Sequence, residues 1–186
     1  MKELGFHDTI VIMPWEKVWE KKFRQEKDSI KLILHSNGLD AQILHVGSTS
    51  IQDMPSKPII DILMLIEDEK PFEPFIDVLQ QAEYRCLGEC DRPGRYFFTK
   101  GNLPNNSFYL HLCRKDHQVA KDQLLFQKIE RSDSTVFRNY ISMKYLAASA
   151  YPDDRTFYRI LKGTFINTVL HLYREMKPEF EDVNEQ

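Results

Sequence analysis

Apolar positions fall into short runs in the first part of the chain. Two of them, residues 41–46 and 58–66, flank a turn-rich polar segment, a pattern typical of two buried strands joined by a functional connection. A strand is also predicted at 84–87, and a hairpin at 95–100 and 107–113. On the last of these strands, alternation places Tyr109, His111 and Cys113 on one face.

Helical spacing of apolar residues dominates elsewhere, above all after residue 117. Helices are predicted at 14–37, 75–82, 119–131, from the Ser132-Asp133-Ser134 capping cluster to 150, and at 155–176. Residues 9–13 form either a short edge strand or an apolar arm. The predicted fold class is α+β, a mixed sheet flanked by helices with a helical C-terminal half. We expect one domain over 1–186, with its sheet part at about 1–116 and its helical part at about 117–178.

Composition and charge narrow the possible partners. The 186 residues carry a formal net charge of −3, so no global positive field recruits nucleic acid, and such a partner would need a local basic patch. The apolar run from Ile59 to Ile66 is broken by Asp61 and is too short to cross a bilayer. The first seven residues lack the apolar segment of a secretory signal, so a cytoplasmic location is expected.

The cysteines Cys86, Cys90 and Cys113 do not form a disulfide framework, because they are few and odd in number. Together with His111 they offer zinc-binding atoms, but their spacing fits no common zinc signature. Buried or incidental thiols are the favoured interpretation.

The connection between the first two strands holds the candidate chemistry. Gly47 permits close backbone approach, and Ser48, Thr49 and Ser50 are residue types that cap a helix and leave its N–H groups facing an anion. A phosphate site and an ordinary capped turn both fit this pattern. Asp61 stands in an otherwise apolar strand, where a carboxylate is costly unless it is paired or binds a metal.

These residues resemble a known family. His45-Val-Gly-Ser-Thr-Ser followed by Lys57-Pro-Ile-Ile-Asp61-Ile is similar to the signature of the GrpB family, bacterial proteins with a nucleotidyltransferase-like fold. The likeness extends over most of the chain, through Arg95-Tyr-Phe-Phe, Leu110-His111-Leu, and a helix with Tyr158, Lys162 and Phe165-Ile166. The chain departs from the family at Phe108-Tyr109, where further histidines are usual, and at Phe126-Gln127-Lys128-Ile129-Glu130.

The resemblance implies kinship with nucleotidyltransferases, whose Gly-Ser turn precedes a strand bearing Asp-x-Asp, with a third carboxylate on a later strand. Clustered carboxylates hold the divalent cations that align a nucleotide phosphate. Here the strand reads Asp61-Ile62-Leu63, so the second carboxylate is absent, and His111 occupies the candidate third position. Histidine suits magnesium less well than an oxygen donor.

Each of the other candidate residues has a structural alternative. Asp61 either binds magnesium or pairs with Lys57 or Arg95. His111 is a metal ligand, an acid–base group or a structural residue, and His45 is favoured as a structural histidine. Lys57 and Arg95 either neutralise phosphate or are surface charges. Tyr158 and Lys162, one helical turn apart, either close a pocket or lie on a solvated helix face.

Three functions follow from this set of residues. The first is an enzyme that transfers a nucleotidyl or phosphoryl group from a nucleoside triphosphate to a small acceptor. Gly47, Ser48 and Thr49 would bind phosphate with Lys57 and Arg95, while Asp61 and His111 would supply the catalytic groups and the magnesium ligands. The second is a module that binds a nucleotide or another phosphorylated small molecule without chemistry. The third is a protein-interaction domain built on the C-terminal helices.

Overall fold

The computed structural model describes residues 9–102 and 105–180, which fall into two compact units. The sheet unit comprises Glu16–Ser50 and Pro58–Gln123. The helical unit comprises Met1–Trp15, Ile51–Lys57 and Leu124–Gln186. The chain therefore passes from the sheet unit into the helical unit and back between its first two strands.

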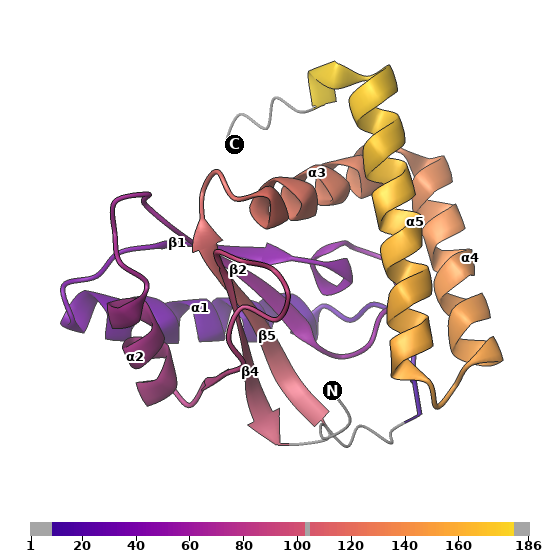
Figure 1. Cartoon of the computed structure of the whole chain (residues 1–186). Helices are drawn as coiled ribbons and strands as arrows, with labels where there is room; N and C mark the ends of the chain where they lie inside the picture. The colour runs from indigo at the N-terminus through magenta and orange to yellow at the C-terminus, as the bar shows by residue number, and fades with distance from the viewer. Residues whose placement is uncertain (1–8, 103–104, 181–186) are drawn as a thin grey trace. The chain divides into compact units, whose positions relative to one another are not determined.

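A mixed sheet of five strands forms the sheet unit, in the order β1-β2-β5-β4-β3 (Figure 1). The strands are β1 (Gln42–Val46), β2 (Ile60–Ile66), β3 (Arg85–Cys86), β4 (Arg95–Asn102) and β5 (Asn105–Arg114). β2 and β5 are parallel, and the other neighbouring pairs are antiparallel. The predicted α+β class with a mixed sheet is confirmed.

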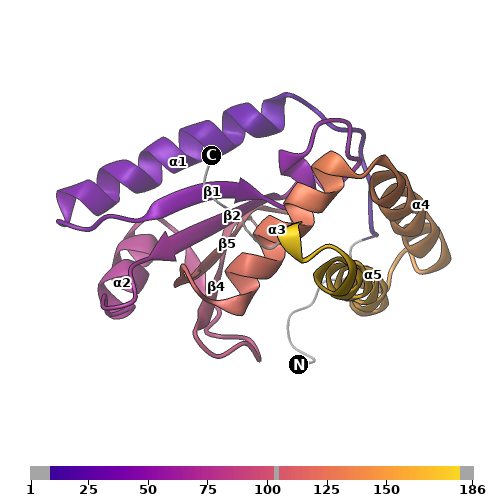
Figure 2. The same cartoon turned by 90° about the horizontal axis from the view of Figure 1, so that it is seen from above.

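Two helices, α1 (Val18–Ser36) and α2 (Glu73–Gln81), belong to the same unit and contact each other. α1 runs along β1 and β2 (Figure 2) and buries one apolar stripe, made of Trp19, Phe23, Ile30 and Leu34. The ring of Phe23 stacks on His45 of β1, so His45 faces α1. The neighbours of His45 across the sheet on this face are the buried Ile62 and Leu110. We call it the covered face.

The opposite face of the sheet carries the polar candidates. Because side chains alternate along a strand, Val46 and its partner Asp61 point away from the covered face. Asp61 in turn pairs with Tyr109, and Leu63 pairs with His111. We call this side of the sheet the polar face, and it confirms the predicted alternation along β5.

The helical unit is built on α4 (Ser134–Ala150) and α5 (Arg155–Met176), which lie side by side (Figure 1). α3 (Gln118–Ser132) begins in the sheet unit and ends in this one, and the short η2 (Pro178–Phe180) follows α5. The core contains Ile51, Met54, Leu125, Phe126, Ile129, Tyr140, Val169, Leu170 and Tyr173. The segment 51–57 thus supplies core residues to a unit formed mainly by the last third of the chain.

Aspartate side chains cap the starts of α4 and α5, and the first of them lies in the predicted capping cluster at 132–134. Asp133 accepts hydrogen bonds from the backbone N–H groups of Thr135 and Val136 at the start of α4. Asp154 accepts one from Phe157 at the start of α5. The predicted start of the first helix at residue 14 is wrong, because α1 begins four residues later, at Val18. Among the described residues, no helix is long and apolar enough to span a membrane.

Residues 9–13 form the predicted apolar arm. Within this arm, Met13 forms an isolated antiparallel β-bridge with Ser56. Ile10 packs in a small apolar cluster with Ala147 and Tyr158. The arm therefore contributes to the helical unit.

His117 joins a tight turn to the start of α3 in the sheet unit. Its Nδ1 accepts a hydrogen bond from the backbone N–H of Val119, and its Nε2 lies 2.8 Å from the carbonyl oxygen of Pro93. The first contact requires an unprotonated Nδ1, so Nε2 carries the hydrogen and donates it to Pro93.

We expect His117→Ala to reduce the free energy of unfolding by about 1–2 kcal/mol, because it removes a helix cap and a side-chain hydrogen bond. Urea denaturation followed by far-UV circular dichroism measures the loss. His117→Asn keeps a capping side chain and should lose less. Equal stability of wild type and His117→Ala would contradict this role.

Candidate functional site

The site begins where β1 ends. Gly47 adopts a positive φ of 70°, a conformation that favours glycine. A Cβ atom built on Gly47 would lie 2.5 Å from Oδ2 of Asp61 and 3.0 Å from its Cβ. The Asp61 side chain therefore lies directly against the backbone of Gly47, and any larger residue at this position would have to displace it.

The residues after Gly47 form a tight turn, here called the Gly47–Ser50 turn. Ser48–Ser50 is a single 3-10 turn, and the Ser50 hydroxyl donates to the carbonyl oxygen of Gly47 at 2.6 Å. The Ser50 N–H donates to the same oxygen at 3.1 Å. Ser48 and Thr49 are buried. The predicted turn is present, with the carboxylate of Asp61 packed against its first residue.

His111 and Asp61 share the polar face on neighbouring strands. They are one strand and two residues apart in register, which corresponds to roughly 8 Å between their Cα atoms. The His111 ring packs near Phe97, with centroids 5.1 Å apart, and Phe97 also meets Tyr109 at 5.2 Å. Tyr109 was predicted on the same face as His111 but was not among the candidate site residues. It lies directly across from Asp61.

Arg95 is also on the polar face but far from Asp61. It pairs with Cys113, which neighbours Leu65 on β2, so it lies two strands and four residues from Asp61. This register corresponds to roughly 16 Å between the Cα atoms, too far for the ion pair considered from the sequence. Burial lowers the pKa of Arg95, the nearby Arg92 lowers it further, and the guanidinium lies 5.3 Å from the centroid of the Phe97 ring.

Lys57 belongs to the helical unit. Its ammonium lies 5.4 Å from the centroid of the Tyr158 ring, a cation–π distance. Of the predicted phosphate-binding residues, Gly47, Ser48 and Thr49 lie together in the sheet unit. The phosphate role of Lys57 stays a prediction.

The donor set on the polar face limits the metals it suits. No group of three or more His, Cys, Asp and Glu side chains within residues 9–102 and 105–180 is arranged to hold a metal ion. Leu63 occupies the position of a second carboxylate and is completely buried. Magnesium is often bound through one or two carboxylates plus substrate phosphates, so Asp61 fits one phosphate-associated ion. The residues do not fit a pair of ions.

The cysteines occupy different places. Cys86 pairs with Phe98, next to Phe97 on β4, so it alternates to the face opposite His111. Burial raises the pKa of the Cys113 thiol to about 12, which makes this cysteine a poor source of thiolate at neutral pH. This geometry favours incidental thiols over a shared zinc site.

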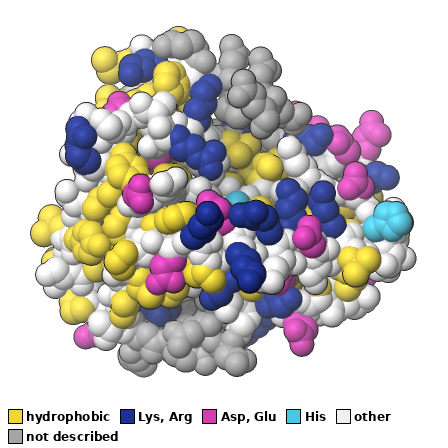
Figure 3. Space-filling view, turned by 180° about the vertical axis from the view of Figure 1, so that it is seen from behind, with side chains coloured by type: hydrophobic (Ala, Val, Ile, Leu, Met, Phe, Trp, Pro, Cys, Tyr) yellow, Lys and Arg dark blue, Asp and Glu magenta, His cyan; other side chains and the backbone are white. Residues whose placement is uncertain are grey.

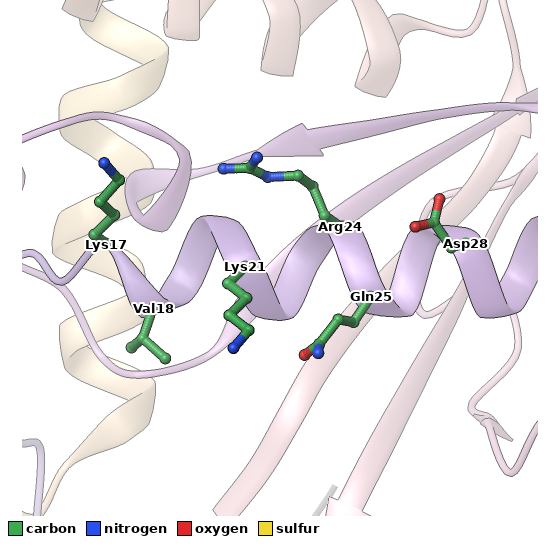
Figure 4. A pocket seen from close by; sticks show the side chains of 6 residues that line it. All are labelled: Lys17, Val18, Lys21, Arg24, Gln25 and Asp28. Carbon is green, nitrogen blue, oxygen red and sulfur yellow. The ribbon is translucent and has the colours of Figure 1, made fainter.

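The exposed side of α1 carries a shallow basic hollow. It is lined by Lys17, Val18, Lys21, Arg24, Gln25 and Asp28 (Figure 4). All six come from one helix and the residue before it, and Arg24 pairs with Glu20 at 3.1 Å. On the face that Figure 3 shows, Lys and Arg side chains are interspersed with Asp and Glu. The hollow is therefore best explained as a solvated helix face.

A charged cluster that sequence analysis did not identify lies in the helical unit. Glu130 and Lys144 are both buried, and the Lys144 ammonium donates to the carbonyl oxygen of Pro55 at 2.5 Å. Burial raises the pKa of Glu130 and lowers that of Lys144, and the charge of Lys162 lowers the Lys144 pKa further. The available signal was the spacing of Lys144 from Tyr140 and Ala147, which places a lysine on the buried stripe of α4.

Two glycines with the same backbone conformation test the contact between Gly47 and Asp61. Gly38 has a φ of 68° and nothing within 4 Å of a built Cβ, whereas Gly47 faces the Asp61 carboxylate. Gly38→Ala should cost about 1–2 kcal/mol from backbone strain alone. Gly47→Ala should cost about 1–3 kcal/mol more, because the methyl group displaces Asp61. Urea unfolding measures both, and equal losses would show that Asp61 does not lie against Gly47.

The buried carboxyl group of Glu130 makes stability depend on pH. Its folded pKa of about 8 lies above the ordinary value of 4.5, so the folded state binds this proton more tightly than the unfolded state does. Stability from this group is present below pH 4.5 and is lost as pH rises towards 8. Glu130→Gln should flatten that decline in thermal unfolding measured across this range. Glu175→Gln, an exposed control on α5, should leave the wild-type slope, and an unchanged slope in Glu130→Gln would refute the assignment.

Comparisons with known proteins show which proteins this chain is similar to. Among curated proteins, PA4798 of Pseudomonas aeruginosa is 30% identical over 164 residues, which cover 88% of this chain and 67% of that protein. YqkA of Bacillus subtilis is 28% identical over 159 residues, 86% of this chain. The match spans 46% of YqkA, so this chain corresponds to about half the length of that relative.

Solved structures share the fold. The GrpB protein of Enterococcus faecalis has a TM-score of 0.71 at 24% identity, over 86% of this chain and 99% of that one. A chain of the GLD-2/RNP-8 complex has a TM-score of 0.61 at 11% identity, over 93% of this chain and 70% of the matched chain. The Cid1 poly(U) polymerase with MgGTP bound has a TM-score of 0.54 at 17% identity, over 90% of this chain and 54% of that one.

At these identities the structures establish a nucleotidyltransferase-like fold and no more. The sequence shows the family, because a family model described as GrpB protein matches residues 9–172. The chain belongs to the GrpB family.

Proposed function

We propose that this protein binds a nucleoside triphosphate at the Gly47–Ser50 turn and transfers its nucleotidyl group to a small acceptor. One observation carries the proposal. The carboxylate of Asp61 lies against Gly47, the glycine that opens the turn. A Cβ atom built on Gly47 would be 2.5 Å from Oδ2 of Asp61. A phosphate held by the turn would therefore lie beside a carboxylate able to share a magnesium ion with it.

The reaction would proceed by in-line displacement at the α-phosphorus. An acceptor oxygen forms the new P–O bond, the bond from the α-phosphorus to the bridging oxygen breaks, and pyrophosphate leaves with the electron pair. The acceptor loses its proton to a base, and His111 on the polar face is the candidate for that role. Magnesium, when bound, would neutralise phosphate charge, with Asp61 as its protein ligand.

Structural relatives support the nucleotide part of this proposal. Cid1 is described as a poly(U) polymerase, and its structures include complexes with MgGTP and with magnesium and 3′-dATP. Those ligands belong to Cid1. Their relevance here is that the same fold accommodates a magnesium nucleotide in a related protein.

A second candidate is a binding module that holds a nucleotide or another phosphorylated small molecule without transfer. The observation that favours it is Leu63, which is fully buried where a second carboxylate would be needed. With a single carboxylate on β2, two cations are not aligned for attack. This candidate predicts binding that persists in a chelator.

Asp61→Asn separates the two candidates. If the protein is an enzyme, the variant should fold normally and lose pyrophosphate release by at least about 100-fold, because the magnesium ligand is gone. Thermal shift with each nucleoside triphosphate, with and without magnesium, should show a magnesium-dependent rise in Tm that the variant lacks. Asp77→Asn, at an exposed position on α2, is the control.

Each outcome has a clear consequence. Full pyrophosphate release in Asp61→Asn would refute the enzyme. Binding without release and without a need for magnesium would establish the module. No thermal shift with any nucleotide in the wild type would refute the enzyme and nucleotide binding by the module, leaving another phosphorylated ligand as the module's only candidate.

A further inference from the structure

His45 lies behind the Gly47–Ser50 turn, on the covered face of the sheet. Its ring stacks on Phe23 of α1, with centroids 4.5 Å apart and planes inclined by 14°. Its Nε2 lies 3.0 Å from the hydroxyl oxygen of Thr49, within hydrogen-bond distance. The stacking fixes the plane of the ring, and the plane fixes where Nε2 points.

Thr49 receives this contact in the middle of the turn. Its side chain is completely buried, so its hydroxyl belongs to the packed layer between the sheet and α1 and is not offered to a ligand. Both α1 and β1 contact the turn. A bond between His45 and Thr49 therefore constrains the backbone of the turn from its inner side.

Asp61 constrains the same turn from the polar face, where it lies against Gly47. The Ser50 hydroxyl closes the turn onto the Gly47 carbonyl oxygen at 2.6 Å. Only one residue, Ser48, separates the two points of contact, Gly47 and Thr49. The turn is thus held from both faces of the sheet in one conformation.

We infer that His45 is a positioning residue for phosphate binding, acting through the Thr49 hydroxyl to hold the Gly47–Ser50 turn ready for an anion. The inference rests on the proposed function and adds a residue that never touches the ligand. A turn already ordered before binding costs less to organise, so losing the hydrogen bond should weaken binding. The effect should appear in affinity as well as in stability.

A double-mutant cycle on His45 and Thr49 tests this inference. The probe is magnesium with inorganic triphosphate, which carries the phosphate groups without a base, titrated into the full chain by calorimetry. Thr49→Val keeps the shape of the side chain and removes only the hydroxyl. His45→Ala removes the partner, and His45→Gln keeps a polar atom near the place of Nε2. His171→Ala, at an exposed position on α5, is the control.

Thr49→Val and His45→Ala should each weaken binding by about five- to tenfold, the effect of one hydrogen bond. The double variant should bind no more weakly than the weaker single variant, because both changes remove the same bond. His45→Gln should recover most of the affinity, and His171→Ala should bind as the wild type does. If His45→Ala does not fold, Thr49→Val and His45→Gln still decide the question.

Unchanged affinity in folded Thr49→Val would overturn the inference, and so would losses that add in the double variant. In either case, triphosphate binding by the wild type would leave the proposed function standing. If the wild type binds neither inorganic triphosphate nor any nucleoside triphosphate, the proposed function is overturned, and this inference with it.

Discussion

The contact between Asp61 and Gly47 constrains the rest of the sheet unit. Gly47 opens the turn after β1, and its partner strand β2 presents Asp61 so closely that a Cβ on Gly47 would lie 2.5 Å from the carboxylate. The antiparallel register of β1 and β2 brings these two residues together by pairing Val46 with Asp61. A slip by one residue would move Asp61 to the covered face, beneath α1. Helix packing on one face thus fixes the position of a carboxylate on the other.

The carboxylate of Asp61 is the one charged side chain in β2, an otherwise apolar strand. An acidic residue in a strand whose other positions are buried and apolar weakens the strand unless something compensates for it. A neighbouring turn whose N–H groups favour an anion, together with a shared cation, would compensate. Leu63 marks the limit of the analogy with two-metal nucleotidyltransferases, because one carboxylate on β2 suits one cation. Under the proposed function, the polar face would hold a magnesium nucleotide through Asp61, and transfer would depend more heavily on His111.

Much of the fold was predictable from local pattern. The strands β1 and β2, the hairpin of β4 and β5, and the helices α1 to α5 all appeared as apolar periodicity bounded by capping or turn residues. The motif suggested that Gly47 and Asp61 lie near each other. Only the strand register shows that they are in contact. The distance of Arg95 from Asp61 was not predictable, since it depends on β5 lying between β2 and β4. Long-range strand order leaves no local trace in the sequence.

The buried pair Glu130 and Lys144 was missed for a related reason. A charge within an amphipathic helix normally lies on its solvated side, and only packing shows which side is buried. The sequence favoured His45 as a structural histidine over a ligand, and its contact with Thr49 lies beside the site.

The most direct test of nucleotide binding at the Gly47–Ser50 turn uses manganese in place of magnesium. Paramagnetic broadening of backbone amide signals would be recorded in a ¹⁵N-labelled protein, with Mn²⁺ and a nucleoside triphosphate added together. We predict that the amides of Gly47, Ser48 and Asp61 broaden first, and only when the nucleotide is present. Broadening that is strongest along the exposed side of α1, or that does not depend on the nucleotide, would contradict a nucleotide site at this turn.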